Sequence, residues 1–276
     1  AINCGIVLVI TVSVALELNV ASGDEALAAK QRSRKGVELR MFDGFEGELG
    51  LNWQPIRHDP THVSLTKNPG TLTITTQRGS IHGDERNDPA GDGLQAKNLY
   101  VIDNPLAADA DFTITLAVKK FQPQTYYHQV ALLCYDDDDN YLKWGYEHNW
   151  REPTTQNFVL VRESAQQPKH DLLLEKSGLN RFWLRVVKRG NKYQCAWSID
   201  GKKFDVVGER PFGNGVPKYL GFIAKNGGNP DAAEIDVCID SFEIRSNPDV
   251  ITGTEQIIPD VTGKVLRVSE ERRDLA

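Results

Sequence analysis

The stretch QVALLCYDDDDNYLKWGYE, residues 129–147, gives the clearest indication of the fold. Its two halves, residues 129–135 and 141–147, are rich in Leu, Val and Tyr, which favour β-strands. Residues 136–140 between them are Asp and Asn, which favour turns. The pattern therefore predicts a β-hairpin with a five-residue loop and an acidic tip.

Side chains along a strand point alternately to two faces, so the hairpin has an apolar face and a mixed face. We expect the apolar face to lie in the core; it comprises Val130, Leu132, Cys134, Leu142, Trp144 and Tyr146. The mixed face comprises Gln129, Ala131, Lys143 and Glu147. This second set suits either a solvated face or the lining of a shallow groove, and we interpret it as the candidate working surface.

The rest of the chain continues the β pattern. With 276 residues and 40% hydrophobic content, it is long enough for one large β domain or two small ones. From residue 38 onward, short apolar runs alternate with turn residues such as Pro69-Gly70 and Asp200-Gly201. We expect thirteen short strands and few helices. That number fits two packed antiparallel sheets of a jelly roll, so the predicted fold class is all-β.

The net charge and the terminal sequences indicate the kind of partner and the location of the protein. A net charge of −6 and a pI near 5.6 argue against a nucleic-acid partner. The apolar run at residues 5–18 is shorter than a membrane span of about 20 residues and is typical of a signal peptide. An uncleaved anchor and a buried strand are the alternatives. We expect a secreted, periplasmic or extracellular protein with no stable membrane span after cleavage. The predicted parts are a leader at 1–36, a sandwich at 37–247 and a tail at 248–276.

Cysteine usage gives no sign of a disulfide framework or a metal site. After loss of the leader, Cys134, Cys195 and Cys238 remain, and each lies in an expected strand. No CxxC spacing occurs. We therefore expect three small buried hydrophobic side chains.

Six segments, taken in order, resemble a known domain family: FDGFEGELGLNWQPIRHDPTHVSLTKNPGTLTI, DADFTITLAVKKFQP, the hairpin of residues 129–147, FWLRVVKRGNKYQCAWSIDGKKF, YLGFIAKNGG and AEIDVCIDSFEIR. They are similar to the concanavalin A-like lectin/glucanase domain at the C-terminus of family-43 β-xylosidases, over about residues 40–246. The resemblance implies a jelly roll of two antiparallel sheets, one of them concave and contacting sugar chains. In β-xylosidases a catalytic propeller accompanies this domain, so we expect a domain that acts alone or beside a separate glycoside hydrolase. The family pattern has Gly where Ala131 stands.

Sugar binding requires aromatic planes together with amide, carboxylate and guanidinium groups. Alternation predicts that the working surface also includes side chains of neighbouring strands, with Trp150 on a flanking loop. The predicted ligand-binding set is Gln129, Lys143, Glu147, Trp150, Trp183, Arg185 and Gln194. The alternative is a hydrated face on which Glu147 pairs with Lys143 or Arg185.

Catalysis and metal binding are the other hypotheses. Family-16 endoglucanases of the same fold carry E-x-D-x-E, and Glu234 and Asp236 begin that pattern, but Cys238 takes the final position. A glycoside hydrolase or polysaccharide lyase would use Glu147, Glu234 or Asp236 as its acid/base groups. The alternative is that the carboxylates of residues 234–236 simply point outward from an edge strand. Asp240 would share the face of Glu234 and Asp236 if alternation continues.

No cofactor is expected with certainty. Because concanavalin A-like folds frequently hold a structural Ca²⁺ near the first and last strands, Asp43 and Asp240 are candidate ligands for it. The first functional hypothesis is a secreted accessory module that binds polysaccharide or oligosaccharide. A protein-interaction or adhesion module is the third, after the hydrolase or lyase.

Overall fold

The computed structural model describes residues 39–82, 94–149, 156–213 and 215–246. In these ranges the chain forms fifteen β-strands and one 3₁₀ helix, Pro60–His62, so the all-β prediction is confirmed. Within the same ranges, none of the helical structure has the length and apolar character needed to cross a membrane. The predicted leader, the predicted tail and Trp150 lie outside the described residues.

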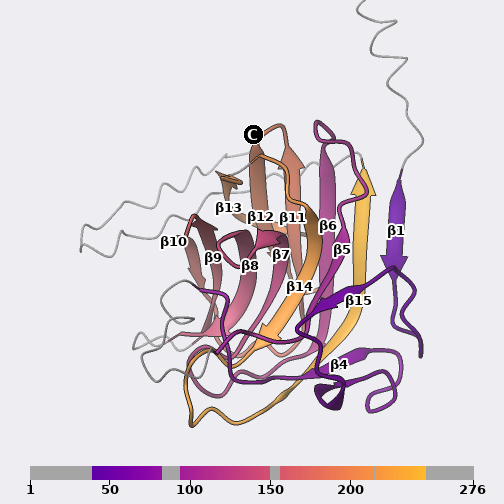
Figure 1. Cartoon of the computed structure of the whole chain (residues 1–276), viewed down its shortest axis with the longest axis vertical. Coiled ribbons are helices and arrows are strands. Elements are labelled where there is room, and N and C mark those ends of the chain that lie inside the picture. The colour runs from indigo at the N-terminus through magenta and orange to yellow at the C-terminus, as the bar shows by residue number, and fades with distance from the viewer. Residues whose placement is uncertain (1–38, 83–93, 150–155, 214, 247–276) are drawn as a thin grey trace, which may run out of the picture. The chain divides into compact units, whose positions relative to one another are not determined.

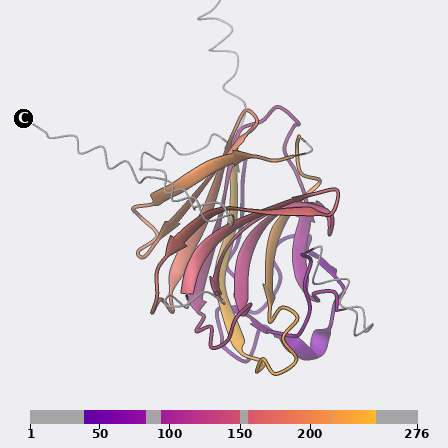
Figure 2. The same ribbon diagram turned by 90° about the vertical axis from the view of Figure 1, so that its left-hand side faces the viewer.

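The strands form two antiparallel sheets, most of whose strands are labelled in Figure 1 and which Figure 2 shows after a quarter turn. The eight-stranded sheet has the order β13-β12-β11-β6-β15-β4-β3, with β1 paired to β15. Its strands are β1 (Arg40–Asp43), β3 (Val63–Ser64), β4 (Leu72–Thr75), β6 (Phe112–Lys120), β11 (Phe182–Arg189), β12 (Lys192–Ser198), β13 (Asp205–Pro211) and β15 (Asp236–Ser246). The seven-stranded sheet has the order β10-β9-β8-β7-β14-β5-β2. Its strands are β2 (Gln54–Ile56), β5 (Leu99–Asp103), β7 (Gln129–Asp137), β8 (Asn140–His148), β9 (Gln156–Ser164), β10 (Gln167–Glu175) and β14 (Tyr219–Lys225).

The main core lies between the two sheets and receives alternate side chains from both. The whole expected apolar face of the β7–β8 hairpin belongs to it, which confirms that part of the prediction. Tyr146 and Phe158 of the seven-stranded sheet pack against Phe182 of the eight-stranded sheet, with ring centroids 4.9–5.7 Å apart. Trp144 Nε1 donates a hydrogen bond to the carbonyl of Ala196 in the opposite sheet, at 2.8 Å. This bond satisfies a polar group that would otherwise be buried at a cost.

The cysteines behave as the sequence predicts. Cys134, Cys195 and Cys238 are free and buried. Burial raises the pKa of the Cys134 and Cys195 thiols well above the usual value, which keeps both protonated. They therefore act as small apolar side chains of the core.

The turn of the β7–β8 hairpin is tighter than predicted. The strands run to Asp137 and resume at Asn140, with an irregularity near Asp137, so two residues form the turn instead of five. The buried Asp138 accepts two hydrogen bonds from the guanidinium of Arg57, at 2.9 and 3.1 Å, and one from Tyr135 Oη at 2.7 Å. Part of the acidic tip is thus fixed to the scaffold.

Two strands, β2 and β10, were not expected from the sequence. The β9–β10 turn contains Ala165 and Gln166, both with positive φ, 49° and 64°. Such a turn normally uses Asn, Asp or Gly, so the usual hairpin signal is absent. β10 also lies at the edge of its sheet and carries charged residues, so its sequence lacks the usual apolar pattern of a strand.

Candidate functional site

Four polar side chains lie in one line across the outer face of the seven-stranded sheet. In the strand registers, Gln129 is opposite Lys225 on one side and Glu147 on the other, and Glu147 is opposite Asn157. We call these four residues the polar row. Their exposed fractions are only 3% for Lys225, 1% for Gln129, 8% for Glu147 and 1% for Asn157. The mixed face of the hairpin is therefore buried, which differs from the hydrated face that is the alternative expectation.

Two amide oxygens of the polar row lack a hydrogen-bond donor. Gln129 Nε2 donates to Glu147 Oε2 at 2.5 Å, which fixes the amide orientation because the reverse would set a carbonyl against the carboxylate. Gln129 Oε1 then points away. In the part of the chain that the structure describes, neither this atom nor Asn157 Oδ1 receives a hydrogen bond, although both are buried. An unsatisfied buried acceptor costs about 1–3 kcal/mol and calls for an explanation.

A strip of small and apolar side chains runs beside the polar row. Ala131 is opposite Ile223 on β14 and Gly145 on β8, and Gly145 is opposite Val159. A Cβ atom at Gly145 would lie 2.5 Å from both Ala131 Cβ and the Val130 carbonyl oxygen. Gly145 therefore permits a close approach of β7 and β8. We call these four outward residues, Ala131, Gly145, Val159 and Ile223, the apolar strip.

Lys143 lies on the far side of the apolar strip. It is opposite Leu133 and Val161, and its Nζ is 5.7 Å from the centroid of the Tyr141 ring. Lys143 is itself buried. The outer side of the sheet thus carries, in order, the polar row, the apolar strip and a lysine over an aromatic ring. The strip is buried, with exposed fractions of 0–1% for its three side chains, and it forms a second apolar cluster with Ile81, Ala96 and Leu99.

His128, which precedes Gln129, joins two loops beside the polar row. Its Nδ1 accepts from the backbone N–H of Gln124 at 3.1 Å, and its Nε2 donates to the Ala233 carbonyl at 2.7 Å. Burial lowers the pKa of His128 and outweighs the opposing effect of its hydrogen bond to the Ala233 carbonyl, so the ring is neutral with its proton on Nε2. The loop before β7 is thereby joined to the loop between β14 and β15.

The structure does not bring Trp183, Arg185 and Gln194 to this face, and that prediction is wrong. All three point outward from β11 and β12, as alternation predicted, but these strands belong to the eight-stranded sheet. Arg185 lies 3.5 Å above the Phe204 ring and donates to Thr115 Oγ1. Alternation assigns a side chain to a face of its own sheet, and it carries no information on which sheet the strand joins.

The carboxylates of the catalytic hypothesis are also distributed over different parts of the fold. Asp236, at the start of β15, accepts from Lys67 Nζ and Thr75 Oγ1, both at 2.8 Å. Burial opposes ionisation, but these hydrogen bonds and the lysine charge outweigh it, so the pKa of Asp236 is lowered. Glu234 Oε2 is 3.2 Å from His62 Nε2. Glu147 is on the opposite sheet.

β15 also departs from the expected alternation. It lies between β6 and β4 instead of at a sheet edge. Register shifts lie on both sides of Ile239, between Cys238 and Ser241, so the simple face assignment that grouped Asp240 with Glu234 and Asp236 does not hold. Asp240 instead lies 3.8 Å from Lys119 Nζ.

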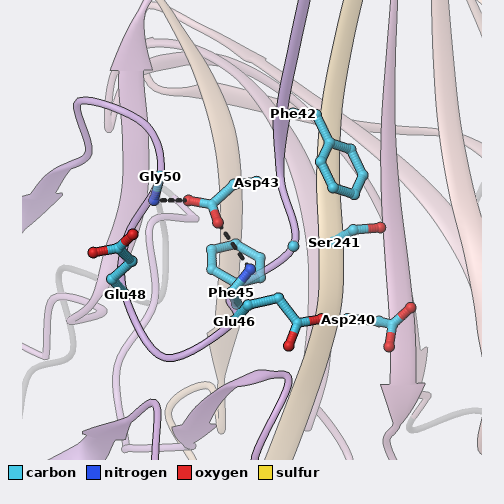
Figure 3. A pocket seen from close by; sticks show the side chains of 9 residues that line it. Phe42, Asp43, Phe45, Glu46, Glu48, Gly50, Asp240 and Ser241 are labelled. Atoms are coloured by element: carbon cyan, nitrogen blue, oxygen red, sulfur yellow. Dashed lines mark hydrogen bonds between the residues drawn. The ribbon is translucent and has the colours of Figure 1, made fainter.

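The two calcium candidates, Asp43 and Asp240, line one pocket of about 330 Å³, drawn in Figure 3. The carboxylate of Asp43 already accepts hydrogen bonds from the N–H groups of Phe45 and Gly50, both at 2.8 Å, and from Trp53 Nε1 at 2.7 Å. These donors hold the loop after β1 and present N–H groups to the oxygens that a cation would need. Among the described residues, no group of three or more His, Cys, Asp or Glu is arranged for a metal. The calcium hypothesis gains no support here.

Sequence reasoning identified Gln129, Lys143 and Glu147 but missed Asn157 and Lys225. Alternation from the core residues Phe158 and Ala224 would have pointed both outward. The register between nonadjacent hairpins, which aligns them with Gln129 and Glu147, had no signal in the local pattern.

The fold is similar to that of several solved proteins. A mutant of the GH43 protein BlXynB from Bacillus licheniformis superposes with a TM-score of 0.61 and 22% identity, over 74% of this chain and 39% of that one. A xylan β-1,4-xylosidase from Bacillus halodurans gives a TM-score of 0.59 and 14% identity, over 74% and 38%. The CBM2 module of the evolved Dit of Lactobacillus casei BL23 phage J-1 gives 0.52 and 10%, over 77% and 98%. At these identities the likeness concerns the fold alone.

The chain spans about two fifths of the length of the two GH43-type structures. No sequence match to a curated protein was found. The two sheets, their order and these superpositions confirm the predicted concanavalin A-like jelly-roll sandwich and its likeness to the xylosidase C-terminal domain. A family model matches residues 59–247, and the chain belongs to the family described as protein of unknown function (DUF1349).

Proposed function

We propose that this domain binds a carbohydrate on the outer face of the seven-stranded sheet. The observation that carries the proposal is the pair of buried amide oxygens, Gln129 Oε1 and Asn157 Oδ1, on either side of Glu147. Sugar hydroxyl groups are donors that would satisfy both atoms. A ligand would then recover the cost of about 1–3 kcal/mol that each unsatisfied oxygen carries in the free protein.

The neighbouring apolar strip complements the polar row. A pyranose ring has hydroxyl groups at its edge and C–H groups on its faces, so it needs acceptors beside a flat apolar surface. The apolar strip crosses four strands, from Ile223 to Val159. It is buried in one cluster with Ile81, Ala96 and Leu99, so the proposal requires that the ligand displaces this cover. Two of the similar folds come from proteins whose names refer to xylan hydrolysis and to a CBM2 module, which agrees with such a ligand.

The proposal is one of binding without hydrolysis. Hydrolysis at a glycosidic bond requires two carboxyl groups about 5–9.5 Å apart, whereas Glu147 stands on a different sheet from Asp236. Secretion, and action beside a separate glycoside hydrolase, are further parts of the proposal that follow from the sequence. A protein-interaction role has no specific observation in its favour.

A glycan array probed with the full chain tests the proposal, followed by titration of any ligand found. Gln129→Ala and Asn157→Ala should each weaken binding by at least about tenfold, since about 1.4 kcal/mol corresponds to that factor. Gln194→Ala is the matched control, because it removes an outward Gln from the eight-stranded sheet. It should leave the affinity unchanged.

Three results would contradict the proposal. One is the absence of any glycan ligand for a folded chain. Another is a loss of binding in Gln194→Ala equal to that in Gln129→Ala. The third is release of reducing sugar from a bound glycan, which would favour the enzyme hypothesis; loss of that release in Glu147→Gln would then identify Glu147 as a catalytic group.

A further inference from the structure

Two histidines from distant parts of the chain converge at the edge of the seven-stranded sheet. His82 Nε2 and His170 Nε2 are 3.4 Å apart, although the residues are separated by 88 positions in the sequence. The rings are tilted by 61° with centroids 5.5 Å apart. The two Nε2 atoms therefore face each other directly instead of being covered by stacked rings.

The separation of the nitrogens fits a shared metal ion. A tetrahedral zinc ion with Zn–N bonds of about 2.0–2.1 Å holds two ligand nitrogens about 3.3–3.4 Å apart. By contrast, an ordinary N–H hydrogen bond has a donor–acceptor distance of about 2.7–3.2 Å. The observed 3.4 Å agrees with the first geometry and is long for the second.

His170 lies in a strand, and His82 lies in a bend two residues after the bridged Ser80. The N–H of His82 donates to Ser80 Oγ at 3.1 Å, and Ser80 itself exchanges backbone hydrogen bonds with Leu94 and Ala96. His170 lies in β10, opposite Val161 and immediately before a register shift. These backbone contacts restrict where the two rings can lie, which favours binding.

We propose that His82 and His170 form a binding site for a divalent transition-metal ion of the zinc, copper and nickel group. Neutral imidazole nitrogen is the ligand type that these ions share. Two protein ligands leave the remaining positions to water or other donors. The ion joins the segment that contains Ser80 and His82 to the edge strand β10. This inference is independent of the proposed carbohydrate site.

Titration of the full untagged chain with Zn²⁺, and separately with Cu²⁺, tests the site. Calorimetry should show one saturable ion per chain, and the Cu²⁺ electron paramagnetic resonance spectrum should show two coordinating nitrogens. His82→Ala and His170→Ala should each weaken binding by at least about tenfold, the minimum effect seen when even an outer-shell partner is lost. The double variant should lose little more, because the two ligands act as a unit.

His62→Ala is the control variant. His62 also lies near carboxylates, 3.6 Å from Asp59 and 3.2 Å from Glu234, and it would collect ions adventitiously. Equal loss in His62→Ala, a one-nitrogen spectrum, or affinity that survives in both His82→Ala and His170→Ala would overturn the proposal. Circular dichroism of each variant distinguishes loss of the site from loss of the fold, and His82→Cys, which keeps a zinc ligand, should restore Zn²⁺ binding.

Discussion

The outer faces of the two sheets carry similar residue types in different environments. On the seven-stranded sheet, Gln129 is buried in the polar row, and on the eight-stranded sheet Gln194 is partly exposed. The ion pairs differ in the same way: Arg57 and Asp138 have side-chain exposures of 25% and 10%, whereas Lys192 and Glu209 have 63% and 39%. The first face resembles an interior that holds polar groups, and the second is more exposed, apart from a small buried cluster of Ala196, Phe204 and Val206.

Because the residue types are similar, the sequence pattern alone could not distinguish the two faces, and the predicted ligand-binding set combined residues of both. A buried polar group needs a partner, either in the protein or in a ligand, because desolvation without one costs free energy. A solvated polar group contributes little to the free energy of unfolding. The following substitutions should therefore have large effects on the seven-stranded sheet and small effects elsewhere.

The largest effect is expected for Asp138→Ala. It removes the acceptor of Arg57 and Tyr135, leaving a partly buried guanidinium without its carboxylate. Loss of one partner of a buried ion pair costs about 3–5 kcal/mol, and we expect the lower end for this partly exposed pair. Urea unfolding measures the change. Glu209→Ala, which breaks the exposed pair with Lys192, should cost less than about 1 kcal/mol; equal costs would mean that the two faces do not differ.

A smaller effect is expected for Gly145→Ala. The new Cβ would meet Ala131 Cβ and the Val130 carbonyl at 2.5 Å, and neither can move without shifting β7. Overpacking of this kind typically costs about 1–3 kcal/mol in the free energy of unfolding. The control is Gly228→Ala, where a Cβ would have nothing within 4 Å. A thermal melt of both variants should show a clear fall for the first and almost none for the second, and a tolerated Gly145→Ala would contradict the close approach of β7 and β8.

Asn157→Leu should separate stability from binding. The substitution keeps the number of side-chain heavy atoms and the branch at Cγ, and it removes the buried, unsatisfied Oδ1 at the loss of one long hydrogen bond to the Phe158 carbonyl, 3.4 Å. We expect the free energy of unfolding to rise by up to about 1 kcal/mol, while affinity for the glycan falls. Gln194→Leu should change neither quantity appreciably. A marked loss of stability in Asn157→Leu would show that the amide belongs to the scaffold and not to a ligand site.

The sequence predicted the strands and their inward faces well because alternation is a local property. The core positions of β7, β8, β11 and β12 follow directly from it. The assignment of Trp183 to the working surface failed because the sheet that a strand joins depends on long-range pairing, here of β11 with β6. The strand β10 was missed because Ala165 and Gln166 adopt positive φ without the residues that usually signal it. Tertiary context decided these features, as it did the burial of Gln129.

The smallest expected effect is the loss of stability at mildly acidic pH, which should depend on the seven-stranded sheet. The strands of the eight-stranded sheet contain no histidine, whereas His128 immediately precedes β7, the strand that carries Gln129. Since burial lowers the pKa of His128 in the folded protein, the unfolded chain, with a histidine pKa of about 6.5, takes up a proton more readily. Its contribution to stability is therefore complete above about pH 6.5 and is lost as the pH falls below that value.

The substitution His128→Gln tests this contribution. Glutamine offers a donor and an acceptor but does not titrate between pH 7 and pH 5. The variant should be less stable than the original protein at pH 7, because it replaces a fitted ring that bonds the Gln124 N–H and the Ala233 carbonyl. It should also lose less stability on acidification, as measured by urea unfolding at both pH values. Parallel losses in the two proteins would place the acid-sensitive group elsewhere and remove His128 from the features that distinguish the seven-stranded sheet.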